Sequence, residues 1–154
     1  MDISLMIEDI KLNFRVGALL KYKDKVLIEK NETVTFSVIP GGRVKIFEDT
    51  KQALDRELKE ELGIDISKEK SNLVSIVENF FIFNNIKYHE MYFIYEYNLS
   101  IDYNIKDGMS SLDSDDSKYY WKSKEELENI EMLPNELKDV ILLKEFKKYV
   151  VRNC

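Results

Sequence analysis

The chain of 154 residues has a single cysteine, no long apolar run and no excess of basic residues. One cysteine, Cys154, cannot form a disulfide within the chain, and this favours a reducing cytoplasm. No apolar run approaches the roughly 20 residues of a membrane-spanning helix. The acidic start, MDISLMIEDI, lacks the basic region of a signal peptide. These absences argue against a secreted disulfide-rich domain and against a membrane protein.

The net charge is −6. Proteins that bind extended DNA or RNA normally present a basic surface, so the charge disfavours nucleic acid as a partner. An acidic protein can still bind a small phosphate-rich molecule if a cation lies between the two sets of negative charge. The length and the hydrophobic fraction of 44% predict one globular domain over residues 1–154. A homodimer is compatible with the sequence, which does not decide the oligomeric state.

Apolar periodicity and turn signals predict a mixed β and α chain with antiparallel hairpins. Strands are expected at residues 12–22, 25–30, 35–39, 73–83, 86–99 and 119–121. Helices are expected from Thr50 to Leu62, after the SKEE cap that begins at Ser123, and from Asn135 to Val150. The polar segment 100–117 is expected to be a loop. This order indicates an α+β fold arranged as an α/β/α sandwich.

The helix after the Pro-Gly-Gly turn carries carboxylates beside its buried face. Three leucines at helical spacing should face the core: Leu54, Leu58 and Leu62. Three glutamates lie on the flank of that stripe: Glu57, Glu60 and Glu61. Carboxylates that are close together and partly desolvated raise one another's pKa, and a hard divalent cation such as Mg²⁺ or Mn²⁺ relieves this. A solvated surface helix is the alternative interpretation.

The residues around these glutamates follow a fixed spacing. Five residues separate Gly42 from Glu48, and seven more separate Glu48 from the run RELKEELGI, which spans Arg56 to Ile64. Residues 42–64 resemble the Nudix box, and every defined position matches. A chance match of its seven polar and glycine positions is expected about once in a million chains of this length or less. Weaker resemblance covers nearly the whole chain, from the first hairpin to the segment after Trp121.

The resemblance to the Nudix family implies a mixed β-sheet between helices and the hydrolysis of a diphosphate linked to another moiety, with Mg²⁺ or Mn²⁺. It implies that Glu60 and Glu61 bind metal with the Gly41 carbonyl, and that Glu57 is a further ligand or the general base. Glu57 and Glu60 are the expected catalytic residues. The remaining box positions are expected to be structural: Gly42, Glu48, Arg56 and Gly63. Arg43, just after the glycines, is expected to contact a substrate phosphate.

Several questions stay open from the sequence. The general base could be Glu57, Glu90 or an aspartate of the 107–116 loop, which holds Asp107, Asp113, Asp115 and Asp116. His89, the one histidine, is more typical of a structural role. Four aromatic residues are candidates for stacking on a base: Phe80, Phe83, Tyr88 and Tyr92. The number of metal ions is not fixed.

The substrate is also open. Signatures of the Nudix branches for ADP-ribose, dinucleoside polyphosphates, NADH and coenzyme A are absent, which leaves a nucleoside triphosphate or a nucleotide sugar as the default. A Nudix-fold binding or regulatory domain without catalysis is the main alternative, although such domains usually lack box glutamates that are all present here. The isomerase branch of the fold needs a cysteine in the body of the chain, and Cys154 is badly placed for that role.

Overall fold

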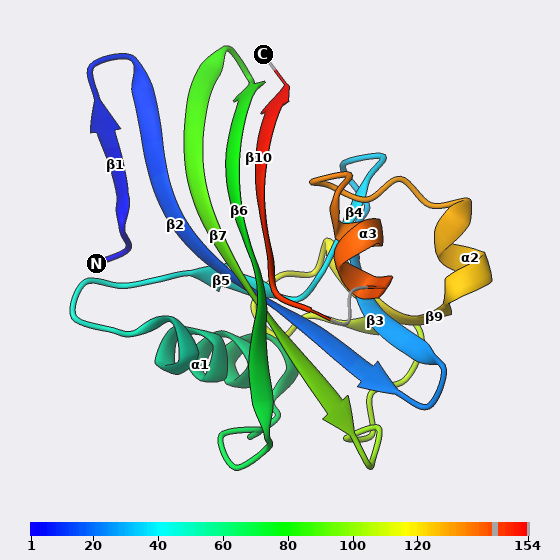
Figure 1. Ribbon diagram of the computed structural model, residues 1–154. Helices are drawn as coiled ribbons and strands as arrows, with labels where there is room; N and C mark the ends of the chain where they lie inside the picture. The colour runs from blue at the N-terminus through cyan, green and yellow to red at the C-terminus, as the bar shows by residue number, and fades with distance from the viewer. Residues whose placement is uncertain (143–144, 154) are drawn as a thin grey trace.

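The computed structural model describes residues 1–142 and 145–153, in which one mixed β-sheet lies between helices (Figure 1). Its strands are β1 (Ser4–Ile7), β2 (Ile10–Tyr22), β3 (Lys25–Asn31), β4 (Ser37–Val38), β5 (Gly41–Arg43), β6 (Ser71–Phe83), β7 (Ile86–Leu99), β8 (Met109–Ser110), β9 (Ser117–Ser123) and β10 (Lys147–Asn153). Its helices are α1 (Thr50–Leu62), α2 (Lys124–Glu128) and α3 (Leu137–Leu142). Among the described residues, no helix has the length and apolar character needed to cross a membrane.

Strand β2 organises the sheet. The hydrogen-bonded order is β10-β6-β7-β2-β3-β9-β8, and β2 also pairs with β1 and β5. One edge of β2 runs parallel to β7, whereas the other edge meets β1, β5 and β3 in turn, all antiparallel. Because β3 pairs with β2 only at residues 21–22, β3 and β9 diverge from the main strands. The Gly-Gly strand β5 lies where they separate.

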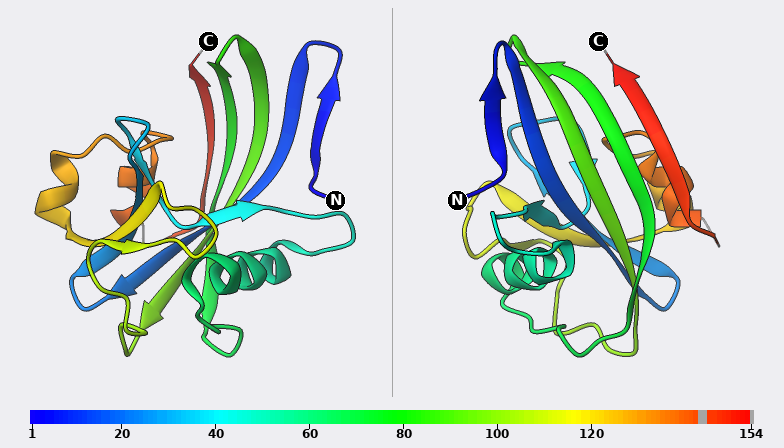
Figure 2. Two further views of the ribbon diagram at one scale, coloured as in Figure 1. Left: turned by 180° about the vertical axis from the view of Figure 1, so that it is seen from behind. Right: turned by 60° about the vertical axis from the view of Figure 1, so that its left-hand side comes forward.

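Alternation along β2 directs its side chains to two separate cores. Val16, Ala18 and Leu20 pack with the apolar face of α1, while Leu19 packs with α2 and α3. The right-hand view of Figure 2 shows α1 and α3 on opposite sides of the central strands. This arrangement confirms the predicted α/β/α sandwich.

Helix α1 forms as its sequence predicts. The Asp49 side chain accepts a hydrogen bond from the Gln52 backbone N–H, and the Gln52 side chain accepts one from the Asp49 backbone N–H. Gly63 ends the helix at a φ of 69°. The predicted leucine stripe is buried: Leu54, Leu58 and Leu62 are at most 5% exposed. Caps at both ends and an apolar stripe therefore fix both the length and the rotation of the helix that carries the glutamates.

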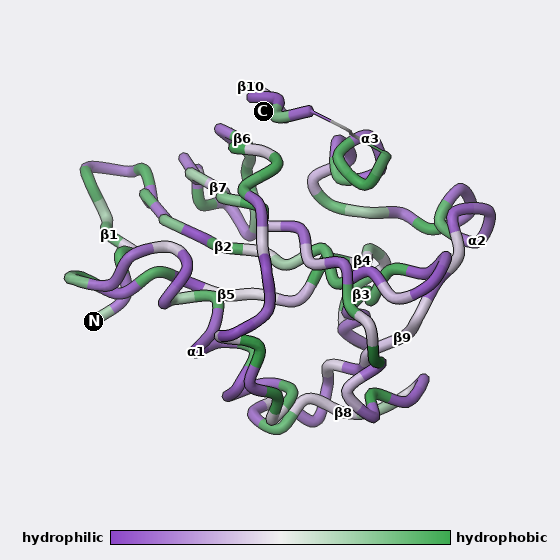
Figure 3. Tube along the Cα trace, turned by 60° about the horizontal axis from the view of Figure 1, so that its bottom comes forward, coloured by the Kyte–Doolittle hydropathy of each residue, from purple (hydrophilic) through white to green (hydrophobic). Residues whose placement is uncertain are grey.

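The predicted closing helix from Asn135 to Val150 is wrong in its second half. Helix α3 is short and largely hydrophobic, in contrast to the hydrophilic α2 (Figure 3). Residues 147–153 instead form β10, which pairs in parallel with β6. Tyr149, Val150 and Val151 favour a strand, and β6 supplies the backbone partners. Phe146, inside the predicted helix, is 54% exposed, while Leu143 and Cys154 lie outside the described residues.

The other differences from the sequence interpretation are smaller. An unpredicted strand, β1, pairs with the start of β2. The strand expected at 35–39 shrinks to β4, and the 100–117 loop contains the short β8. Both predicted hairpin turns are present, with positive φ angles at Lys23, Asn84 and Asn85.

Candidate active site

The two glycines of β5 allow two close approaches, of β5 to β2 at Gly41 and of the box helix to β5 at Gly42. A Cβ atom on Gly41 would lie 2.0 Å from the carbonyl oxygen of Val16, and one on Gly42 would lie 2.2 Å from the carboxyl carbon of Glu57. Real Cβ atoms essentially never come so near. The Glu57 carboxylate therefore rests directly on the Gly-Gly backbone, in space that only a glycine leaves open.

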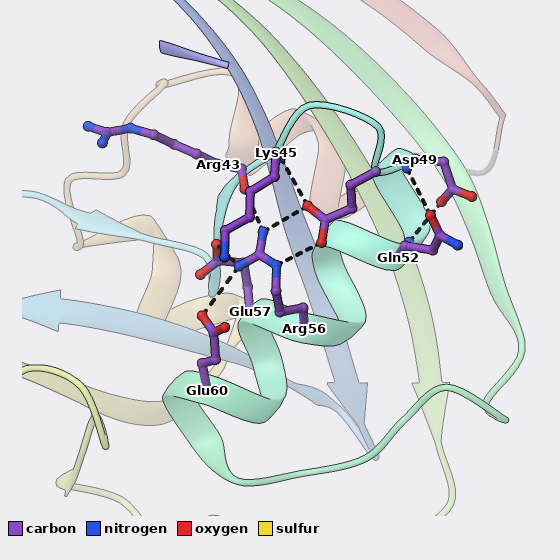
Figure 4. A network of polar contacts seen from close by, with 8 residues as sticks. Arg43, Lys45, Asp49, Gln52, Arg56, Glu57 and Glu60 are labelled. Atoms are coloured by element: carbon purple, nitrogen blue, oxygen red, sulfur yellow. Dashed lines mark hydrogen bonds and ion pairs between the residues drawn. The ribbon is translucent and has the colours of Figure 1, made fainter. Parts of the chain in front are cut away.

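Arg56 joins the loop that precedes α1 to the helix itself. Its Nε and Nη2 donate to the two carboxylate oxygens of Glu48 at 2.7 and 2.9 Å, and Nη2 also donates to the Arg43 carbonyl at 2.9 Å. Its Nη1 donates to Glu57 at 2.6 Å and to Glu60 at 3.3 Å. Figure 4 shows Arg56 reaching toward Glu57 and Glu60, with the Arg43 side chain pointing away. The bonds from Arg56 hold the pKa of the Glu48 carboxyl below its usual value.

Glu61 lies in a negatively charged and partly dry environment. Burial, followed by the charges of Glu29, Glu57 and Asp113, raises the pKa of Glu61 to about 8. Burial likewise raises the pKa of Glu57 despite its bond to Arg56. The one side-chain hydrogen bond to Glu61 within the described ranges comes from the Tyr119 hydroxyl, at 3.3 Å. No cationic side chain of the described residues forms an ion pair with Glu61, so burial and the neighbouring carboxylates dominate its pKa.

Glu60 differs from its two neighbours. Its side chain is 47% exposed, whereas that of Glu57 is 13% exposed. In the part of the chain that the structure describes, no set of three or more His, Cys, Asp or Glu side chains has the spacing of a finished metal site. The box thus keeps Glu57 mostly buried and places Glu60 at the solvent boundary.

Of the aspartates in the 107–116 loop, Asp113 is the one whose charge acts on Glu61 and Glu29. The loop is tied to the helix end because the Leu112 backbone donates to the Glu61 carbonyl at 2.8 Å. Asp107 accepts a hydrogen bond from the Trp121 backbone at 2.8 Å, a structural contact between the loop and β9. Neither Asp115 nor Asp116 is among the leading causes of the raised pKa of Glu61.

Glu29 is the carboxylate that the sequence reasoning missed. It lies on β3, where that strand diverges from β2, and its charge is the first one that raises the pKa of Glu61. Burial raises the pKa of Glu29 itself, although Arg15 opposes the shift. A glutamate that follows three apolar strand residues is a weak sequence signal of a functional site, since only the fold brings Glu29 near the box helix.

A cavity of about 470 Å³ lies on the face of the sheet opposite to α1. Arg43 lines this cavity, and its exposed side chain also pairs with Asp2 at 3.6 Å. Of the four aromatic candidates for base stacking, Phe83, Tyr88 and Tyr92 line it. Phe80 does not; it stacks on His89 at 4.3 Å between ring centroids. Glu90 also lines the cavity and is 5% exposed.

The NUDIX domain family profile matches residues 11–145. Among solved structures, a MutT protein from Bacillus halodurans is similar at 20% identity with a TM-score of 0.70, covering 88% of this chain and 86% of that chain. A MutT Nudix hydrolase from Burkholderia pseudomallei is similar at 19% identity with a TM-score of 0.64, covering 85% of this chain and 96% of that chain. An ADP-ribose pyrophosphatase from Streptococcus suis is similar at 14% identity with a TM-score of 0.54, covering 90% of this chain and 98% of that chain.

No curated protein sequence matches this chain. Identities this low show a shared fold, and the family itself follows from the profile over most of the chain. The complete box, its glycine-supported helix and the profile match agree: the chain belongs to the Nudix family of pyrophosphohydrolases.

Proposed function

We propose that this protein hydrolyses the diphosphate bond of a nucleoside diphosphate linked to another moiety, with a nucleoside triphosphate or a nucleotide sugar as the favoured substrate. The observation that carries the proposal is Glu61, a partly buried carboxylate whose pKa is raised to about 8 by burial and by neighbouring carboxylates. Such a group is suited to a site where a cation arrives with a phosphate ligand.

The carboxylates fit Mg²⁺ or Mn²⁺ as the cofactor, because oxygen ligands suit these hard ions. Glu57, Glu60 and Glu61 would hold the metal together with the Gly41 carbonyl. A finished three-carboxylate cage is not required, since Mg²⁺ usually keeps several waters and binds through one or two carboxylates plus substrate phosphates. When bound, the ion would polarise the phosphorus and lower the pKa of water.

The chain's own groups support the remaining chemistry. Glu57, held by Arg56 against the Gly-Gly backbone, is positioned to accept a proton from water, and Glu60 at the solvent boundary is positioned to meet an incoming ligand. Asp113 remains a second candidate for the general base because its charge acts on Glu61. Glu48 and Gly63 fix the loop and the helix end.

Substrate would extend from the carboxylates of α1 past β5 to the cavity on the opposite face of the sheet. Arg43 belongs to the Gly-Gly strand and also lines the cavity, so its guanidinium is placed to bind a phosphate oxygen. The nucleoside part would enter the cavity beyond it. The low cysteine content supports a cytoplasmic location for this activity.

A non-catalytic nucleotide-binding domain is the second candidate function. The test is a panel of nucleoside triphosphates and nucleotide sugars with Mg²⁺ or Mn²⁺, in which released phosphate is measured after phosphatase coupling. We expect turnover that requires the metal and is lost in Glu61→Gln but kept in Glu125→Gln, which changes an exposed glutamate on α2. Tight nucleotide binding without turnover would favour the binding domain instead.

A further inference from the structure

The cavity has a polar floor, made of Asn13, Arg15, Asn79 and Glu90. Asn13 on β2 and Asn79 on β6 are both register partners of Glu90 on β7, so these three form a row across adjacent strands. Arg15 follows Asn13 by two residues on β2 and therefore lies on the same face. Neighbouring strands are about 4.8 Å apart, which is the scale of the hydrogen-bonding edge of a nucleobase.

Several polar atoms of this floor are buried without a hydrogen-bond partner. Asn13, Asn79 and Glu90 are 3%, 7% and 5% exposed. The Oδ1 atoms of both asparagines and the Nε of Arg15 have no hydrogen-bond partner. Within the described residues, the Glu90 carboxylate likewise accepts no side-chain hydrogen bond. Buried polar groups cost stability unless they are hydrogen-bonded, so a floor of this kind indicates a ligand that completes it.

Arg15 and Glu90 give the polar floor a fixed donor and a fixed acceptor. Burial alone would lower the pKa of Arg15, but the negative charges led by Glu90 outweigh it and leave that pKa raised. The two side chains are near enough to interact, yet they do not form a contact ion pair among the described residues. Each therefore keeps hydrogen-bonding capacity for a third group: Arg15 can only donate, and an ionised Glu90 can only accept.

The walls of the cavity suit a flat ring. The rings of Phe81 and Tyr88 stack on each other with centroids 4.7 Å apart and planes 3° apart, and both residues line the cavity. Ile82 and Phe83 add apolar surface beside them. A planar heterocycle can pack on such a wall while its polar edge reaches the floor.

We propose that the polar floor selects a nucleotide whose base presents one acceptor beside two N–H donors, the edge of a guanine-type base. The base oxygen would accept from Arg15, and its ring N–H and amino group would donate to Glu90 and to an asparagine oxygen. This inference rests on the proposed function, because it names the substrate class of the same enzyme. The other bases fit less well: adenine and cytosine place a ring acceptor beside one amino group, and uracil has a single donor between two acceptors.

The experiment compares kcat/KM for dGTP, dATP, dCTP and dTTP with Mg²⁺ in the wild type and in Glu90→Gln. We expect dGTP to lead in the wild type by about tenfold or more, the scale of one bidentate base contact. A glutamine amide presents one donor and one acceptor, which complements adenine, so Glu90→Gln should lower the dGTP to dATP ratio by about tenfold. Glu78→Gln, on the opposite face of the neighbouring strand, is the matched control and should leave the ratio unchanged.

Calorimetric binding of GMP, AMP, CMP and UMP without metal separates this inference from the proposed function. If GMP binds best and Glu90→Gln removes that preference, the polar floor reads the base even when no triphosphate is hydrolysed. Four outcomes would each overturn the inference. Two are equal kcat/KM for the four triphosphates and equal binding of the four monophosphates. The others are no binding of any monophosphate and a Glu90→Gln loss that is the same for every base. A structural role for Glu90 would lower all four together and leave the ratios fixed.

Discussion

Replacing Arg56 by lysine keeps the positive charge but removes the planar fork that joins the box loop to α1. The guanidinium donates five hydrogen bonds, which end on Glu48, Glu57, Glu60 and the Arg43 carbonyl. A lysine ammonium is a compact donor that cannot span this set of acceptors. The Arg56 side chain is 21% exposed, so water can replace only part of the hydrogen bonds that lysine would lose.

The magnitude follows from those bonds. A hydrogen bond to a charged group contributes about 1.5–3 kcal/mol. Lysine would keep one or two contacts, and the half-buried acceptors would recover some hydration. We therefore expect Arg56→Lys to lower the free energy of unfolding by about 2–3 kcal/mol, which corresponds to a fall in Tm of roughly 5–10 °C for a chain of this size.

The assay is urea unfolding of both proteins without metal, followed by circular dichroism. Arg152→Lys, at an exposed position on β10, is the matched control, and it should change the unfolding free energy by less than about 0.5 kcal/mol. If Arg56→Lys also stays within that range, the loop-to-helix network is not the structural element inferred here.

Three further outcomes are expected. Gly42→Ala places a methyl group on the Glu57 carboxylate and should lower kcat by about tenfold or more with little change in Tm, whereas unchanged kinetics would show that the close approach has no functional role. In metal-free protein, Glu61 of the unfolded chain loses its proton near the usual pKa of 4.5, whereas burial raises the pKa of Glu61 in the folded chain to about 8. The free energy of unfolding should therefore fall as the pH rises from 4.5 to about 8. This fall should be smaller in Glu61→Gln, as measured by urea titrations at pH 5.5 and 8 in EDTA, and an equal fall would argue against the burial of Glu61. Arg43→Ala should raise KM with little effect on kcat in steady-state assays, because a phosphate contact is made in both ground and transition states; a fall in kcat alone would contradict that role.

Local rules predicted the elements that depend on local sequence. The helix from Thr50 to Leu62 and its leucine stripe were predicted, and the Asp49 cap and Gly63 stop that bound the helix act within a few residues. Asn84 and Asn85 adopt the positive φ angles that a tight hairpin turn needs. The Nudix box is a further local signal, because its residues lie on one turn and one helix.

Elements that depend on distant partners were not predictable in the same way. Strand β10 exists because β6 offers a parallel edge about seventy residues earlier in the chain, and apolar spacing alone suggested that a helix would continue there. Glu29 reaches Glu61 only because β3 diverges from β2. The polar floor likewise requires the register of β2, β7 and β6, which no pattern within a single strand contains.

On the proposed function, the box carboxylates bind the divalent cation used in diphosphate hydrolysis. The most direct test of this binding is kcat/KM at saturating Mg²⁺ for the wild type, Glu60→Gln and Glu61→Gln, on the best substrate of the diphosphate panel. Each substitution removes a negative ligand without changing side-chain size, so we expect losses of about 10²-fold or more. If both variants keep near wild-type turnover, the glutamates of α1 form a solvated helix face and the catalytic metal site lies elsewhere.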